Sequence, residues 1–325
     1  MKPSKPPRHT GMMKKSPVNR DNKKGNNVMK KMIALILAML MVVACFAGCQ
    51  PSNPTADENK PGESEAGTTA PADTATNAPD ETTAPVDEKP VIVVGYTIYE
   101  PMNYFDENGK LIGFDTELAE AVFGNLGYKV LFQEIDWTQK YTDLESGAID
   151  CVWNGFTCNT ADDDGVLRSE KVDFSYNYME NRQVIITKAD SGIAAAADLA
   201  GKLGAVESGS AGETYAATFE GASIKGFLKQ VDCLMEVNAG TADFAVLDAQ
   251  LAKSYAGKGD YANIVIVDAL SSDVEYYAIG FVKGSALTDD VNAQLEALAA
   301  DGTIAALAEK YGVSNTAITD FSDQK

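Results

Sequence analysis

The chain has 325 residues with 47 acidic and 27 basic side chains, which give a net charge of −20 at pH 7. Residues 1–48 hold ten of the basic residues and one acid, a net charge of +9, so the rest of the chain carries −29, which excludes binding of nucleic acid through its phosphates. The one histidine, His9, also lies in residues 1–48, which excludes Ser-His-Asp and Cys-His catalytic sites and His-ligated zinc from the remainder, and we expect no metal and no cofactor.

Residues 1–48 predict a signal peptide with a basic N-terminal extension. Met29-Lys30-Lys31 precedes the apolar run MIALILAMLMVVACFAGC. Phe46-Ala47-Gly48-Cys49 resembles a lipobox, so we expect Cys49 to be diacylated and to become the mature N-terminus. The alternative is an uncleaved membrane anchor, but Met32–Ala47 is short for a bilayer span. Residues 1–28 are either part of the basic region or follow from a start assigned upstream of Met29.

Residues 49–90 predict a lipidated cysteine and a disordered tether. From Gln50 to Pro90 the composition is rich in Thr, Ala, Pro, Asp and Glu, with almost no large apolar residue, so this part cannot form a core. A flexible chain of this length has an end-to-end distance of roughly 35 Å. About 230 residues then remain, which suffice for two lobes of ordinary size.

The folded part predicts two βα series. In the first, strands are expected at Val91–Gly95, Lys129–Gln133 and Ile149–Trp153, and helices at Thr116–Leu126 and Gln139–Ser146. Val184–Thr187 is expected to cross over in an extended conformation. In the second, strands are expected at Leu203–Val206, Phe244–Leu247 and Ile264–Val267, and helices at Ala211–Phe219, Phe227–Val237 and Ala249–Tyr255. Tyr276–Val282 crosses back to the helices Val291–Ala300 and Ile304–Lys310, which predicts an α/β protein with parallel sheets and one lobe inserted in the other.

The segment from Ile149 to Thr187 combines a buried strand, a polar strand end and a loop with an arginine. After Trp153 the strand ends in residues that expose a backbone carbonyl at Gly155 and a hydroxyl at Thr157. Ligands bind at this end of the strands in open α/β sheets. The segment therefore predicts part of a ligand site.

This segment resembles the family 3 solute-binding proteins, the amino-acid receptors of ABC importers. The matching elements are Gly155, Thr157, Arg168, Val172-Asp173-Phe174-Ser175, Tyr176 and Tyr178. Further matching motifs, spread over residues 91–315, are GFDTELAEAV from Gly113, GSAGETY from Gly209, ADFAVLDAQLA from Ala242, EYYAIGF from Glu275 and LAADGTIAALAEKYG. The resemblance implies the periplasmic-binding-protein type II fold, in which two Rossmann-like lobes are joined by hinge strands, here near Tyr178–Arg182 and Asp273–Tyr277. Lobe I would comprise residues 91–180 and 276–320, and lobe II residues 181–275.

The resemblance also implies a site that matches both charges of a free amino acid. Each charge costs several kcal/mol to remove from water unless it is paired. Arg168 would bind the carboxylate, because its planar fork makes paired bonds. The backbone N–H groups of the Ser210-Ala211-Gly212 turn would add donors at the start of a helix. Asp248 would bind the ammonium, together with the Gly155 carbonyl and the Thr157 hydroxyl.

Arg168 departs from the usual family spacing, which places the arginine five residues after the threonine. That position is Asp162 here, whereas counting back from Val172 recovers the spacing to Arg168. We expect six inserted residues in the loop, with the role of Arg168 kept. The alternative is a solvated Arg168 that pairs with Asp162–Asp164.

The resemblance implies that the ligand side chain meets two aromatic rings and an acid. Tyr99 and Trp137 stand where relatives carry flat side chains that sandwich the ligand, the alternative being core packing. Thr97 stands where relatives for basic or amide ligands often have an acid. Glu207 in the lobe II loop would favour a polar or cationic ligand and disfavour an acidic one, unless it is a solvated loop acid.

The three cysteines after Cys49 have no metal-binding spacing. Cys151 and Cys233 lie in apolar stretches, so we expect both to be small core residues. A disulfide between Cys151 and Cys158 requires the chain to reverse at Gly155, because a strand otherwise separates the two.

These features predict a lipid-anchored extracytoplasmic protein, not an enzyme, on the outer face of the cell membrane. It would be a monomer that closes on a free amino acid and presents it to the permease and ATPase subunits of an ABC importer. A dehydratase-like enzyme and a ligand-sensing module on the same fold are the alternatives. Substrate turnover would distinguish an enzyme, and neighbouring permease and ATPase genes would distinguish a transport protein from a sensor.

Overall fold

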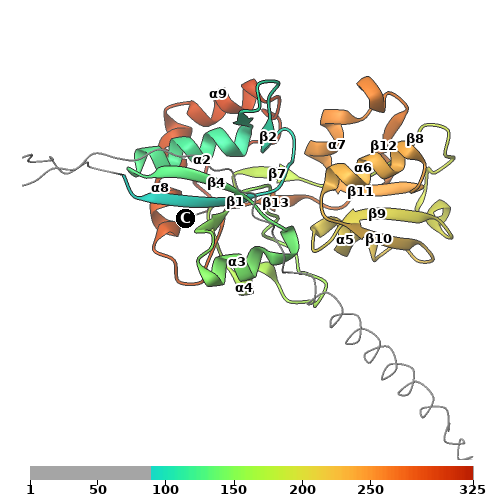
Figure 1. The fold of residues 1–325 in the computed structure, drawn as a ribbon, viewed down its shortest axis with the longest axis horizontal. Helices are drawn as coiled ribbons and strands as arrows, with labels where there is room; N and C mark the ends of the chain where they lie inside the picture. The colour runs from blue at the N-terminus through green and yellow to red at the C-terminus, as the bar shows by residue number, and fades with distance from the viewer. Residues whose placement is uncertain (1–88, 325) are drawn as a thin grey trace, which may run out of the picture. The chain divides into compact units, whose positions relative to one another are not determined.

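The computed structural model describes residues 89–324 (Figure 1). The predicted signal peptide, the predicted lipidation site Cys49 and the predicted tether up to residue 88 lie outside the described residues. Within the described part, no helix is long and apolar enough to span a bilayer.

The first sheet has five strands in the order β4-β1-β5-β14-β6. These are β1 (Val91–Tyr96), β4 (Lys129–Glu134), β5 (Cys151–Val152), β6 (Asp173–Phe174) and β14 (Gly280–Phe281). β1 runs parallel to β4 and β5, whereas β14, which comes from the end of the chain, is antiparallel to both of its neighbours. β1 lies between β4 and β5 and is buried over most of its length, as its apolar sequence predicts.

Helices cover the first sheet. They are α2 (Phe114–Asn125), η3 (Trp137–Gln139), α3 (Lys140–Ser146), α4 (Arg168–Lys171), α8 (Leu287–Ala300) and α9 (Thr303–Lys310), with the short strands β2 (Tyr104–Phe105) and β3 (Leu111–Ile112) before α2. α2 packs against β4, α8 and α9, and in Figure 1 α3 and α4 lie on the opposite side of the strands. The apolar positions of α2 are fully buried, including Leu118, Val122 and Phe123. The C-terminal helices thus complete the core that the N-terminal strands begin.

The second sheet has the strand order β10-β9-β11-β8-β12. Its elements are β8 (Gln183–Lys188), η4 (Ala196–Leu199), β9 (Leu203–Glu207), α5 (Ala211–Ala216), β10 (Ser223–Phe227), α6 (Gln230–Ala239), β11 (Phe244–Asp248), α7 (Ala249–Tyr255), η5 (Gly259–Tyr261), β12 (Ile264–Val267) and η6 (Asp268–Leu270). β9, β10 and β11 are parallel, and β8 is antiparallel to both β11 and β12.

Alternation along the central strands explains why both faces of this sheet are covered. Successive side chains of a strand point to opposite faces. In β11, Ala245 and Leu247 belong to the core that includes α6 and α7, whereas Phe244 and Val246 belong to the core on the α5 side. A strand buried on both faces reads as one continuous apolar run, as Phe244–Leu247 does.

Two short strands pass between the two sheets. β7 (Met179–Asn181) and β13 (Glu275–Tyr277) pair antiparallel, with Asn181 opposite Glu275. They lie at the two predicted hinge segments, and Figure 1 shows them between the two helix-covered sheets. The expected fold of two α/β lobes and two hinge strands is confirmed. We call the parts built on the first and second sheets lobe I and lobe II.

Several predicted elements need correction. The predicted helix Phe227–Val237 is wrong at its start, because Phe227 ends strand β10 and the helix begins at Gln230. β10 lies at the sheet edge and contains Lys225 and Gly226, so it lacks the apolar run of a buried strand. The predicted helix from Ala211 ends at Ala216, and the strand predicted at Ile149–Trp153 is hydrogen-bonded as a strand only at Cys151–Val152.

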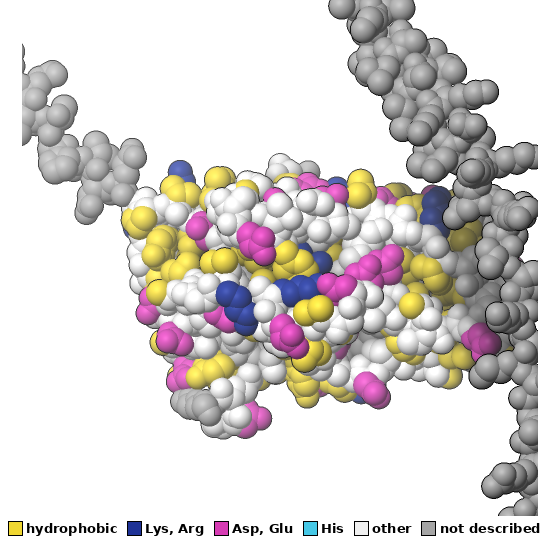
Figure 2. Space-filling view, turned by 90° about the horizontal axis from the view of Figure 1, so that it is seen from below, with side chains coloured by type: hydrophobic (Ala, Val, Ile, Leu, Met, Phe, Trp, Pro, Cys, Tyr) yellow, Lys and Arg dark blue, Asp and Glu magenta, His cyan; other side chains and the backbone are white. Residues whose placement is uncertain are grey.

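The surface mixes residue types. The face drawn in Figure 2 carries acidic and basic side chains interspersed with apolar ones. The cysteines Cys151 and Cys233 are buried as predicted. Cys151, Cys158 and Cys233 are all free, so the Cys151–Cys158 disulfide is not present.

Candidate functional site

A small pocket that is partly open to solvent lies between the two lobes, with a cavity volume of only about 10 Å³. Its lining residues are Trp137, Asn154, Gly155, Thr157 and Arg168 from lobe I, and Glu207, Ser210, Ala211, Gln230 and Asp248 from lobe II. Eight of the nine residues predicted from the sequence to bind the ligand line this cavity. Tyr99 does not, and Asn154 and Gln230 were not predicted.

The loop before Arg168 folds back on itself. Asp162 and Val166 join through a backbone hydrogen bond of 3.0 Å, and Ala161 pairs with Leu167 in an antiparallel bridge. Gly165 has φ of +76°, a conformation that glycine adopts without strain, and its N–H donates to the Asp162 carbonyl. Residues 161–167 therefore form a closed loop that returns the chain to the cavity at Arg168, the first residue of α4.

Arg168 is buried, with 1% of its surface exposed. Nε donates to Oδ1 of Asp162 at 2.8 Å, Nη1 to the Thr157 carbonyl at 3.3 Å, and Nη2 to the Gly209 carbonyl of lobe II at 3.1 Å. A guanidinium carries five N–H groups, so these three bonds leave two for a ligand. The alternative hypothesis predicted a solvated Arg168 that pairs with the acidic loop. Arg168 is not solvated, but it does pair with Asp162.

Asp162 balances this buried charge. Burial alone would raise the pKa of its carboxyl, but the nearby Arg168 and a hydrogen bond from Lys171 lower that pKa to about 2. Lys171 bonds the second oxygen of Asp162 at 2.7 Å, and the Tyr141 hydroxyl donates to the same oxygen at 2.6 Å. Asp162 therefore stays ionised and anchors the guanidinium before any ligand arrives.

Gly155 needs both its conformation and its small size. Its φ is +56°, and a Cβ atom there would come within 2.7 Å of the Tyr99 ring and about 3 Å of the Tyr277 ring. Its N–H donates to Oδ2 of the fully buried Asp115 at 2.9 Å, and that oxygen also accepts from the Tyr178 hydroxyl. Asp115 thus fixes the strand end that forms one wall of the cavity.

The lobe II loop before α5 supplies the opposite wall. Ser210 caps α5 by accepting from the Glu213 N–H at 3.1 Å, and Glu213 accepts in return from the Gly209 N–H at 2.7 Å. Ala211 then lines the cavity in the first turn, where helix N–H groups have no partner within the helix.

Asp248, the last residue of β11, is held from several sides. Gln230 donates to its Oδ2 and accepts from its backbone N–H at 2.9 Å. Asn181 and Gln183 both donate to its Oδ1, at 2.7 and 2.6 Å. Burial raises the pKa of Asp248 although these donors act to lower it. Gln230 was missed in the sequence because the preceding strand β10 was missed.

Glu207, the last residue of β9, is 4% exposed and thus not a solvated loop acid. Its Oε1 has no hydrogen-bond partner among the described residues. Burial and the nearby Asp248 raise the pKa of this carboxyl to about 8. A buried oxygen without a partner favours a ligand that can donate to it.

The two aromatic side chains differ in position. Trp137 lines the cavity, and its Nε1 has no partner among the described residues. The Tyr99 hydroxyl instead lies 2.7 Å from the Tyr277 hydroxyl, and its ring lies behind Gly155. Thr97 does not line the cavity either, and its hydroxyl donates to Asn154.

Lys140 does not line the cavity but packs behind its wall, and it was not predicted from the sequence. It is 2% exposed, lies over the rings of Trp137 and Tyr141, and donates to the Trp137 carbonyl and to the Gly209 carbonyl of lobe II, each at 3.2 Å. Burial and the nearby Arg168 lower the pKa of its ammonium to about 7. In the sequence it is only a lysine near the start of the predicted helix Gln139–Ser146.

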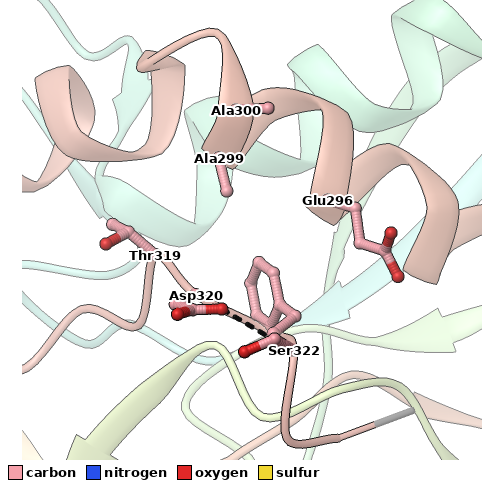
Figure 3. Close-up of a pocket in the computed structure, with 7 residues that line it drawn as sticks. Glu296, Ala299, Ala300, Thr319, Asp320 and Ser322 are labelled. Atoms are coloured by element: carbon pink, nitrogen blue, oxygen red, sulfur yellow. Dashed lines mark hydrogen bonds between the residues drawn. The ribbon is translucent and has the colours of Figure 1, made fainter.

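Another cavity lies between α8 and the C-terminal segment (Figure 3). Its lining includes the acids Glu296 and Asp320 but no Lys or Arg, and Asp320 accepts from the backbone N–H of Ser322 at 2.9 Å. It therefore lacks the cation that an amino-acid carboxylate needs. Among the described residues, no cluster of acids, cysteines or histidines is arranged to hold a metal ion.

Comparison with known proteins places the chain among binding proteins. Residues 91–314 match the bacterial extracellular solute-binding proteins, family 3. The chain is 31% identical to the arginine-binding extracellular protein ArtP of Bacillus subtilis over 66% of this chain and 82% of that protein. It is 30% identical to the L-cystine-binding protein TcyA of the same species, over 87% of this chain and 97% of that protein. A solved ancestral arginine-binding protein bound to arginine is 34% identical with a TM-score of 0.62, over 68% of this chain and 97% of that one.

Proposed function

The chain belongs to the bacterial extracellular solute-binding proteins of family 3, and from this membership and the cavity we propose that it is the substrate-binding component of an amino-acid ABC importer. It binds one free L-amino acid between its lobes. Its partners are the permease and ATPase subunits of that importer, and it acts as a monomer held on the outer face of the membrane by a lipidated Cys49.

The observation that supports this function is the opposition of two buried charges across the cavity. Arg168 presents two N–H groups from lobe I, and Asp248 presents a carboxyl group from lobe II. Arg168 matches the α-carboxylate of an amino acid and Asp248 matches its ammonium. Neither charge of the ligand is therefore left unpaired when it leaves water. The Ala211 turn adds N–H groups for the carboxylate, and Thr157 and Gly155 add oxygen atoms for the ammonium.

The side chain of the ligand is polar or cationic. Glu207 offers a buried oxygen without a partner, and Trp137 offers a flat apolar surface beside it. An acidic ligand would bring a second carboxylate against Glu207 and Asp248 and would be disfavoured. The names of the two relatives, which bind arginine and L-cystine, fit a polar or cationic preference.

A thermal-shift screen of the purified protein against the twenty common L-amino acids, followed by calorimetry, tests this function. Ligand at about 100 times its dissociation constant stabilises the folded state by about 2.7 kcal/mol, so a binder raises the melting temperature. We expect a stoichiometry of one and recovery of the ligand chemically unchanged. If no amino acid shifts the melting temperature or gives binding heat, the proposal is wrong, and conversion of the bound ligand would indicate an enzyme.

A further inference from the structure

The strand register brings four polar side chains together at the hinge. β11 pairs with β8 so that Asp248 lies opposite Gln183, and β13 pairs with β7 so that Glu275 lies opposite Asn181. All four side chains are buried. They come from lobe II and the hinge strands, and Thr157 of lobe I adds a hydrogen bond to Glu275.

The two amides bridge the two carboxyl groups. Asn181 Nδ2 donates to Oδ1 of Asp248 at 2.7 Å and to Oε1 of Glu275 at 2.6 Å. Gln183 Nε2 donates to the same two oxygens, at 2.6 and 2.7 Å. Two oxygens that share both donors are no more than about 5 Å apart.

No cation within ion-pair distance compensates these two carboxyl groups. Asp248 and Glu275 are 6% and 7% exposed, and no ion pair within residues 89–324 includes either of them. The groups nearest the pair are Glu207 on β9, Tyr99, Tyr277, Thr157, Cys158 and Gln230. Arg168 faces Asp248 from the other side of the ligand cavity, where its Nε is already paired with Asp162. Two buried carboxylates at this separation repel each other, which favours a proton on one of them.

We propose that Asp248 and Glu275 hold one proton between them in the empty protein and release it to solvent when the ammonium group of the ligand reaches Asp248. The inference rests on the proposed function, because it assigns the ammonium to Asp248. No covalent bond other than the carboxyl O–H breaks, and the proton passes to the buffer. Glu275 does not line the ligand cavity and acts through Asp248, so it is a positioning residue.

The direction of the pH effect follows from linkage. Burial raises the pKa of both carboxyl groups in the empty site. An ammonium placed against Asp248 lowers that pKa, so the bound state holds one proton fewer than the empty state. Affinity therefore rises with pH below the raised pKa, by up to about tenfold per pH unit for one proton, and levels off above it.

Calorimetry in buffers of different ionisation heat counts the protons directly. The probe is L-arginine, or the amino acid that the thermal screen shows to bind more tightly. At a pH of about 6 we expect wild type to release about one proton in addition to any from Glu207. Glu275→Gln preserves the size of the side chain and removes one carboxyl, so it should bind within about tenfold of wild type and release about one proton fewer.

Two controls separate this inference from its alternatives. Glu207→Gln should keep the proton that Glu275→Gln loses, because Glu207 has no bond to either amide. In the empty protein, wild type should lose thermal stability relative to Glu275→Gln as pH rises from about 5 to about 8, since a raised carboxyl pKa stabilises only the protonated form.

Equal proton release by wild type and Glu275→Gln would overturn the inference and leave the proposed function standing. Absence of binding by every amino acid would overturn both.

Discussion

Asp162 accepts a hydrogen bond from Nε of Arg168 at 2.8 Å, and this buried ion pair joins the two ends of the acidic loop. Asp162 occupies the position at which the family spacing places the arginine. If the loop holds the six inserted residues that we predict, the insertion keeps the cation and adds an anion beside it. With Nε occupied, the ligand meets the end of the guanidinium that carries Nη1 and Nη2.

Arg168→Met should abolish binding of every amino acid alike. Leaving the ligand carboxylate buried without its cation costs about 3–5 kcal/mol, which is more than a hundredfold in affinity. Calorimetry with several amino acids measures this. Lys171→Met is the matched control, because it also removes a cation from Asp162 but none from the cavity, and it should bind within a few-fold of wild type. If Arg168→Met binds as tightly as that control, the carboxylate is held by another group.

Glu207→Gln should change the ranking of ligands while the common part of the molecule still binds. A cationic side chain loses the attraction of a carboxylate in a buried site, so its affinity should fall by about tenfold or more, whereas a neutral amide ligand should change little. Competition assays with L-arginine and L-glutamine give the ratio. An unchanged ratio would show that the ligand side chain does not reach Glu207.

The pH dependence of the empty protein should also report Glu207. Its pKa of about 8 in the folded state lies above the value of about 4.3 in an unfolded chain. The protonated form is thus favoured by folding, so the contribution to stability is complete below about pH 4 and is lost as pH rises to about 8. The melting temperature should fall over this range, and it should fall less in Glu207→Gln. Parallel profiles would mean that Glu207 stays ionised.

The continuous apolar runs and the motifs after them were sufficient to predict most of the fold. Phe244–Leu247 became a strand because it offers apolar side chains to two faces, and Asp248 falls at its end. Ile264–Val267 lies at the sheet edge and was predicted because all four of its residues are apolar. β10 was not predicted because an edge strand needs only one buried face and so lacks a continuous apolar run. Gln230, which begins the helix after it, was not recognised as a site residue either.

The contacts between residues distant in sequence could not be predicted. Lys140 is buried by the rings of Trp137 and Tyr141 and by the Gly209 carbonyl of lobe II, which is distant in sequence. Tyr99 follows a strand at the mouth of lobe I, but the hydroxyl of Tyr277, 178 residues later, holds it away from the cavity. Pairings of this kind depend on tertiary packing, which short-range patterns do not record.

Cys49→Ser should release the protein into the medium or leave it unprocessed. We predict lipidation of Cys49 from the sequence, and this residue lies outside the described part of the structure. Detergent partitioning and mass spectrometry of the mature N-terminus measure the outcome. An unmodified Cys49 on a membrane-bound protein would exclude the lipid anchor.

Lys140→Met should raise stability and weaken ligand binding at the same time. The ammonium of Lys140 is buried without a carboxylate partner, and burying an unpaired charge lowers the stability of the folded state. A methionine of similar length carries no charge and avoids this cost. The same ammonium donates across the lobes to the Gly209 carbonyl, beside the loop that caps α5. Its removal therefore loosens one wall of the cavity, and we expect affinity to fall by about tenfold while the melting temperature rises.

The pH dependence distinguishes this role of Lys140 from simple packing. Burial lowers the pKa of Lys140 to about 7, below the value of about 10.4 in an unfolded chain, so the destabilisation is complete below pH 7 and shrinks as pH rises toward about 10. The melting temperatures of wild type and Lys140→Met should converge over that range. Lys229→Met, which breaks the exposed ion pair with Glu134 between the lobes, should change stability by at most about 1 kcal/mol and show no such convergence. A Lys140→Met protein that binds as tightly as wild type would show that Arg168 alone holds the Gly209 loop.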